Sequence, residues 1–259
     1  LIIKNWVGLA ALTVLYFVGS LCNAFGFSRF FIHDDMASKW IMAIYLRTMI
    51  GKYLPGNVGH LAVRHIMLAR FIKKPKKLAA SHIIDMAASV LAASALVLTL
   101  SVFTDIPEAH LKLWAYKEFR WAVVFTLLVL GLLSFRIYSR INPKLQTYLT
   151  PFFVALPGYA GFLCVSTLSF LLWSQLCMQV DLSVNAVIDI SFAYLVAWTL
   201  GYVTVGAPGG IGVREATIVF LLAPFYDKDL VLSIAFGHRI IAILGEALGY
   251  GASYMMGLS

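Results

Sequence analysis

Two short segments of this sequence combine helix-breaking residues with arginine, a combination that can bind an anion. Residues 55–59 (PGNVG) and 208–212 (PGGIG) share the pattern Pro-Gly-x-aliphatic-Gly, and each is followed within ten residues by an arginine, Arg64 or Arg214. Proline and glycine interrupt a helix, and the backbone N–H groups freed at a half-helix start bind anions. Arginine adds a planar fork of donors that can bind two phosphate oxygens at once. The residues of these breaks that we expect to line an anion site are Pro55, Gly56, Asn57, Pro208, Gly209 and Gly210.

Further ionisable residues lie within or beside apolar stretches. A charge facing lipid costs on the order of 3 kcal/mol, so each should face protein or water. Arg239 and Glu246 are seven residues apart, hence on one helix face but about 10 Å apart along its axis, too far to pair directly. We expect them to pair with other helices, for example with Glu215 or Arg214. The charged residues of the predicted substrate site are Arg64, Arg214, Glu215, Arg239 and Glu246.

Three alternative explanations of these patterns stay open. Proline and glycine are common in membrane helices, and a third match at 157–161 (PGYAG) has no following arginine, so chance could supply the pattern. We expect a helix start or a kink at that third match. The charges could instead form a structural ion-pair network, or Arg64 and Arg239 could snorkel to the membrane interface.

The elements that must position these residues are membrane helices. Of the 259 residues, 61% are hydrophobic and only 12% are charged, whereas an ordinary soluble domain is nearer a quarter charged. Mean hydropathy is +0.87, which excludes a soluble globular class. Long runs such as 83–100 are apolar at both odd and even positions, whereas strands of a transmembrane barrel alternate. This pattern predicts helices rather than a barrel.

The sequence predicts an all-α polytopic membrane protein of about six to eight transmembrane helices, forming one domain over residues 1–259. Two broken or re-entrant segments are expected around Pro55 and Pro208, within 40–71 and 206–225. Because the chain starts in an apolar run without methionine, we expect that an N-terminal helix is missing. The continuous spans are expected at 6–27, 78–103, 121–138, 152–178, 186–205 and 230–256.

The formal charge of +8 is explained by the membrane rather than by nucleic acid. Many of the basic residues lie in two clusters next to apolar runs, as cytoplasmic loops do under the positive-inside rule. These clusters are Lys73, Lys74, Lys76 and Lys77, and Arg136, Arg140 and Lys144.

Catalytic motifs are not found in the sequence. There is no Gly-x-Ser-x-Gly, His-Glu-x-x-His, Walker sequence or Cys-x-x-Cys, so a transporter is expected rather than an enzyme, with no catalytic residues, no metal and no cofactor. His82 and Asp85 are one turn apart, but no second ligand pair supports a metal site. Gly245 and Gly249 are expected to serve helix packing.

Around residues 52–59 (KYLPGNVG) and 206–216 (GAPGGIGVREA), the sequence resembles the membrane region of lysylphosphatidylglycerol synthase/flippase proteins and their stand-alone relatives. The order of segments is similar over nearly the whole chain. The resemblance implies a multi-pass protein of the bacterial or archaeal inner membrane that flips a phospholipid or handles a lipid-linked envelope intermediate. It does not imply synthase activity, because the cytosolic aminoacyl-transfer domain of the two-function members does not follow here.

Three functions are compatible with the sequence. The first is a flippase in which intramembrane arginines bind the phosphate headgroup of a membrane lipid and Glu215 or Glu246 tunes or releases it. The second is a membrane enzyme acting on a lipid phosphate, with Asp85, Glu215 or Glu246 as acid or base. The third is a scaffold that docks a glycosyltransferase of a lipid-linked glycan pathway through its basic loops. A homo-oligomer is possible in each case.

Overall fold

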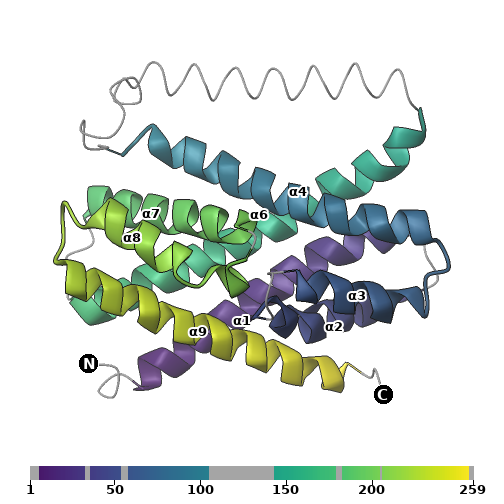
Figure 1. Ribbon diagram of the computed structural model, residues 1–259, viewed down its shortest axis with the longest axis horizontal. Helices are drawn as coiled ribbons and strands as arrows, with labels where there is room; N and C mark the ends of the chain where they lie inside the picture. Colours follow the sequence, from purple (N-terminus) through teal and green to yellow (C-terminus); the bar gives the residue numbers. More distant parts are fainter. Residues whose placement is uncertain are drawn as a thin grey trace.

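The described part of the chain is built from helices. The computed structural model describes residues 6–32, 36–53, 58–104, 143–178, 183–204 and 206–256, and of 143–150 and Met178 the backbone only. Within these ranges there is no strand, which agrees with the predicted all-α class. The helices are α1 (Trp6–Ser28), α2 (Ser38–Thr48), α3 (Gly59–Ala69), α4 (Pro75–Ser101), α6 (Pro143–Met178), α7 (Val184–Val203), α8 (Val213–Leu222) and α9 (Lys228–Met255), with 3-10 turns η2 (Arg29–Phe31), η3 (Met49–Tyr53) and η5 (Pro208–Gly210) (Figure 1).

Five of the described helical segments are long and apolar enough to cross a membrane. The predicted spans at 6–27, 78–103, 152–178, 186–205 and 230–256 correspond to them, while the predicted span at 121–138 lies outside the described residues, as do Arg136 and Arg140. The five segments are Trp6–Phe31, Pro75–Ser101, Pro151–Cys177, Val184–Val203 and Lys228–Met255.

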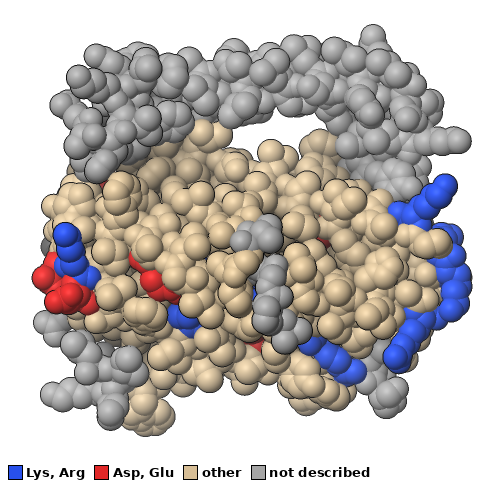
Figure 2. Space-filling view, in the orientation of Figure 1, with Lys and Arg blue, Asp and Glu red and all other residues tan. Residues whose placement is uncertain are grey.

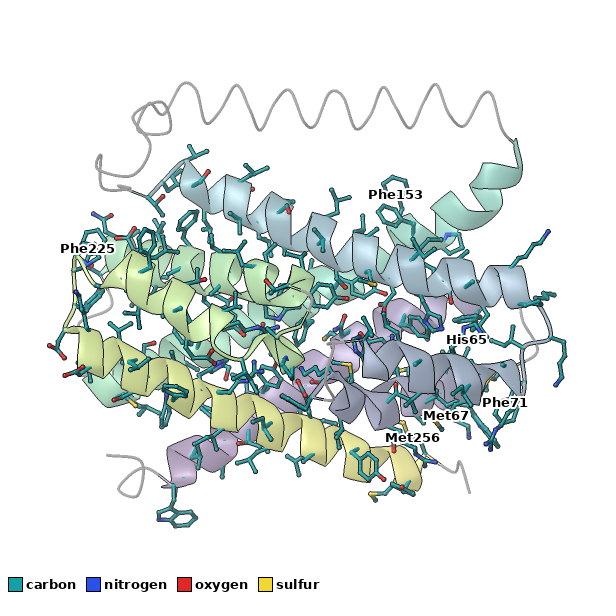
Figure 3. The ribbon with its side chains drawn as sticks, in the orientation of Figure 1. His65, Met67, Phe71, Phe153, Phe225 and Met256 are labelled. Atoms are coloured by element: carbon teal, nitrogen blue, oxygen red, sulfur yellow. The ribbon has the colours of Figure 1, made fainter. Side chains whose placement is uncertain are left out.

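Exposed charge is gathered mainly at the two ends of the helical bundle. In the face shown in Figure 2, Lys and Arg cluster at the right-hand end, a mixed acidic and basic group lies at the left-hand end, and the broad middle is largely uncharged. Lys73, Lys74 and Lys76 are exposed in the turn from α3 to α4. Phe71 and Phe225, each about half exposed, lie at opposite ends (Figure 3). An apolar middle between polar ends is the pattern of a membrane-embedded protein.

Two hairpins enter the bundle from opposite ends and meet inside it (Figure 1). The first is α2, η3 and α3; the second is α7, η5 and α8, and the turns η3 and η5 contact each other. Helices α2 and α3 have eleven residues each and α8 has ten. They are therefore about 15–16 Å long, roughly half of a bilayer's hydrocarbon core. The described helices are thus interrupted near both predicted positions, between α2 and α3 and between α7 and α8.

Glycines bring the long helices close together. An added Cβ at Gly158 of α6 would lie 2.6 Å from Gly26 Cα of α1, so the two backbones touch there. The third Pro-Gly match, which was expected to start or kink a helix, thus lies inside α6 and serves helix packing. Gly245 packs on Tyr16 and Gly249 on Leu46, which confirms their predicted packing role.

Candidate functional site

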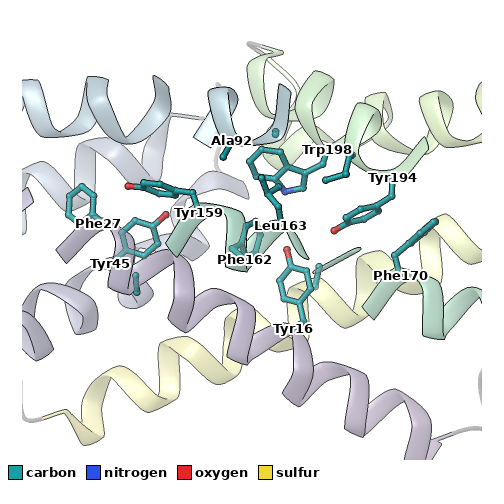
Figure 4. Close-up of a cluster of buried hydrophobic side chains, with 14 of the residues drawn as sticks. Tyr16, Phe27, Tyr45, Ala92, Tyr159, Phe162, Leu163, Phe170, Tyr194 and Trp198 are labelled. Carbon is teal, nitrogen blue, oxygen red and sulfur yellow. The ribbon is translucent and has the colours of Figure 1, made fainter. Parts of the chain in front are cut away.

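A small enclosed cavity lies where the two hairpins meet. Its volume is about 30 Å³. That is enough for one or two water molecules. Basic and polar side chains line one part of it, and an aromatic wall that belongs to the buried cluster of Figure 4 lines the rest. The lining residues are Asn23, Tyr45, Met49, Lys52, His60, Phe162, Trp198, Tyr202, Gly209 and Arg214.

The second break is shaped by its glycines. Gly209 and Gly210 have φ angles of +58° and +76°, which favour glycine. Both also leave room for an arginine, since an added Cβ would lie 2.7 Å from Arg239 Nη2 at Gly209 and 2.8 Å from Arg214 Nε at Gly210. The break thus provides the space in which two guanidinium groups lie close to the cavity.

Arg214 lines the cavity without a counter-ion. Its side chain packs against Gly201 of α7, and its guanidinium lies 5.6 Å from the centroid of the Trp198 ring. Its Nε is buried and has no hydrogen-bond partner among the described residues. Within the same residues, no carboxylate lies within 4 Å of it. Arg214 therefore presents an unneutralised positive charge to the cavity.

Arg239 lies behind the break, next to the cavity. Its Nη2 donates a hydrogen bond to the carbonyl oxygen of Gly209, and its guanidinium lies 5.5 Å from the centroid of the Tyr53 ring. Its Nε is also buried without a hydrogen-bond partner in the described part of the chain. Arg239 holds η5 against η3 and adds a second positive charge.

A buried ion pair joins the first break to α9. Lys52 Nζ in η3 donates to Glu246 Oε1, and the two side chains are 12% and 1% exposed. Glu246 Oε2 is buried with no partner among the described residues. Lys52 is thus paired with a carboxylate, whereas Arg214 and Arg239 have none within 4 Å among the described residues, which leaves two positive charges without a counter-ion. An anion is the natural ligand of such a cluster.

Neutral polar groups around the cavity also lack partners. Asn23 Oδ1 and His60 Nδ1 are buried with no hydrogen bond within the described ranges, and their residues are only 5% and 8% exposed. An unsatisfied buried polar group costs about 1–3 kcal/mol. Several such groups around one cavity indicate a binding site rather than a site optimised for stability.

Arg64, predicted to bind the anion, lies in a separate structural network. Its Nη1 donates to Asp85 Oδ2 at 2.8 Å, and Tyr159 donates its hydroxyl to Asp85 Oδ1 at 2.5 Å. Its guanidinium lies 3.8 Å from the centroid of the Tyr45 ring, and the residue is fully buried. The network ties α3, α4 and α6 together, as the ion-pair alternative proposed, and Arg64 is not among the residues that line the cavity.

Glu215 likewise makes a structural contact, at the start of its own helix. Its carboxylate accepts a hydrogen bond from Gly212 N–H at 2.7 Å and so caps the start of α8. The expected pairing of Glu246 with Arg214 does not occur, because Lys52 takes that position. The break residues Pro55, Gly56 and Asn57 lie outside the described residues.

His82 and Asp85 do not lie together on one ligand. His82 stacks on Phe27, with ring centroids 6.0 Å apart, and Asp85 is taken by Arg64. No group of three metal-ligating side chains occurs among the residues that were described. The described cysteines are unpaired.

The sequence analysis missed Lys52 and Asn23 as residues of the site. Lys52 stands three residues before Pro55, so a lysine adjoining a predicted break was a usable signal. Asn23 is a single amide in an apolar span, and only its position in the fold places it at the cavity.

Comparison with known proteins identifies no similar protein. No protein-family model, no curated protein and no solved structure matches this chain. The predicted resemblance to lysylphosphatidylglycerol synthase/flippase membrane regions therefore stays a prediction.

Proposed function

We propose that this protein binds the anionic headgroup of a membrane lipid between its two hairpins and moves that lipid between the leaflets. The observation that carries the proposal is the buried excess of positive charge at the meeting point of the two breaks. Arg214 and Arg239 bind the phosphate oxygens, because guanidinium forks match phosphate geometry. Lys52 contributes a third cation.

A lipid is favoured over a dissolved anion because of where the cavity lies. It is enclosed by helices whose outer surfaces are apolar, with exposed residues such as Ile83 and Phe236. Paired broken helices with a polar site between them are the arrangement of many secondary transporters. We take the hairpins to be re-entrant segments in an inner-membrane protein of about six to eight spans, related to the lysylphosphatidylglycerol synthase/flippase membrane region.

The cavity must open for this function. A volume of about 30 Å³ holds water but no phosphate headgroup. We therefore take the arrangement in which η3 and η5 contact each other as the closed state of the proposed cycle. Separation of the two hairpin tips would admit the headgroup from one leaflet and release it to the other.

The test is translocation of fluorescent phosphatidylglycerol in proteoliposomes that contain the purified full chain. Arg214→Gln and Arg239→Gln should each lower the rate about tenfold or more, since loss of a charge-assisted hydrogen bond costs about 1.5–3 kcal/mol. The matched control is Arg70→Gln, which removes an exposed arginine at the end of α3 and should leave the rate unchanged.

The headgroup and the fold supply two further controls. Phosphatidylcholine has no net charge and should be moved poorly by the wild type. Circular dichroism and gel filtration should show that each variant is folded. Equal rates for the wild type and the folded Arg214→Gln variant would overturn the proposal and favour a scaffold that acts through a partner enzyme.

A further inference from the structure

We propose that Glu246 is the binding site of a coupling proton, and that its ion pair with Lys52 is the latch that keeps the cavity closed. The inference rests on the proposed function and adds its energy source. Glu246 has one carboxylate oxygen on the Lys52 ammonium and the other buried without a partner in the described residues. That oxygen has the Tyr53 hydroxyl of η3 as a neighbour and is otherwise open to a proton.

The ion pair is placed to act as a latch because it joins the tip of the first hairpin to a long helix. Lys52 lies in η3, and Glu246 lies in the second half of α9. The tip is folded tightly on its own hairpin, since an added Cβ at Gly51 would lie 2.9 Å from the backbone of His60. When the pair breaks, η3 and the start of α3 can therefore move together.

The electrostatics of the cluster link the proton to the anion. An anionic headgroup on Arg214 and Arg239 neutralises those cations and adds a negative charge nearby, which favours the protonated carboxyl. The groups that interact with Glu246 are Lys52 and Tyr53 of η3, Tyr16 of α1 and Tyr194 of α7. Arg214 of α8 and Arg239 of α9 lie near the same Lys52 and Tyr53, while Arg47 of α2 lies further along α9 at Ser253.

Protonation then completes the site. One proton from water binds the Glu246 carboxylate, the ion pair is lost, and the Lys52 ammonium is free to contact the same headgroup. One proton therefore enters with one monoanionic lipid. Binding of the proton and the lipid together leaves the net charge of the site unchanged. Because the coupling is reciprocal, a lower pH must strengthen lipid binding to the same degree that lipid binding strengthens proton binding.

The experiment measures proton uptake on lipid binding to the detergent-solubilised full chain. Isothermal titration with dioctanoyl phosphatidylglycerol, in buffers of different ionisation enthalpy, gives both the affinity and the number of protons bound. The wild type should take up as much as one proton per lipid within pH 5–8. Its affinity should rise by up to tenfold per unit decrease in pH in the range of uptake.

Glu246→Gln imitates the protonated carboxyl and should bind the lipid without proton uptake and with pH-independent affinity. The matched control Asp229→Asn removes an exposed carboxylate of α9 about 25 Å away along the helix and should behave as the wild type.

Wild-type binding without proton uptake, or uptake that persists in Glu246→Gln, overturns the latch. The wild-type result alone is decisive where Glu246→Gln does not fold. The proposed function fails differently, by equal binding of dioctanoyl phosphatidylglycerol to the wild type and to Arg214→Gln.

Discussion

Replacing Asp85 with asparagine should destabilise the protein strongly, because it leaves the Arg64 guanidinium buried without a counter-ion. The side chains are nearly the same size, so no cavity forms, and the asparagine oxygen can still accept the hydrogen bond from Tyr159. What is lost is the attraction between two charges about 4 Å apart, which is worth about 4 kcal/mol at an effective dielectric constant near 20. Removal of one partner of a buried ion pair generally costs about 3–5 kcal/mol.

The order of costs among the variants tests this reasoning more sharply than one number. Arg64→Met should cost less than Asp85→Asn, because a buried carboxylate can be neutralised by a proton whereas a guanidinium stays charged. The double variant should be more stable than Asp85→Asn alone, since it buries no charge. Unfolding by SDS in mixed micelles measures all three. A cost below about 1 kcal/mol for Asp85→Asn, or a double variant no more stable than Asp85→Asn, would refute the assignment of a structural ion pair.

Three further predictions can be tested by the same measurement of unfolding in SDS. Gly210→Ala should cost about 1–3 kcal/mol more than Gly212→Ala, because both residues have positive φ but only the first has atoms within 4 Å of an added Cβ; equal costs would contradict this. Gly158→Ala should cost about 1–3 kcal/mol of stability through overpacking. The control Gly251→Ala meets no atom within 4 Å and should be neutral or slightly stabilising. A neutral Gly158→Ala would show that α1 and α6 move apart to accommodate the methyl group. Arg214→Gln should keep or raise stability, because it removes a half-buried charge that has no counter-ion among the described residues; a loss of several kcal/mol would make this arginine structural.

Most of the fold among the described residues could be predicted from apolar run lengths. The span predicted at 78–103 is α4 at Pro75–Ser101, and that at 230–256 is α9 at Lys228–Met255. Bilayer thickness fixes helix length so strongly that composition alone locates such spans. The start of α6 was missed by nine residues, because the helix continues through Pro151, which directly precedes the predicted span, as it does through Pro157.

The candidate site was predicted in part. The breaks and Arg214 do meet at a cavity, since glycines at positive φ cannot continue a helix and the arginine follows within one turn of α8. The predicted role of Arg64 was not supported, because the decisive partner, Asp85, comes from another helix. Spacing along a chain identifies neighbours on one helix but not across helices.

The sequence by itself determined that this protein is helical and built for a membrane, where it is interrupted, and which charges cannot face lipid. Those properties follow from local backbone geometry and from the cost of placing charge in hydrocarbon. Only the tertiary structure decided which of those charges neutralise one another. Arg64 pairs with Asp85 and Lys52 pairs with Glu246, whereas Arg214 and Arg239 have no carboxylate partner within the described residues. Ion pairing depends on distances of a few ångströms between helices, and those distances are set by packing at residues such as Gly158 rather than by the order of residues along the chain.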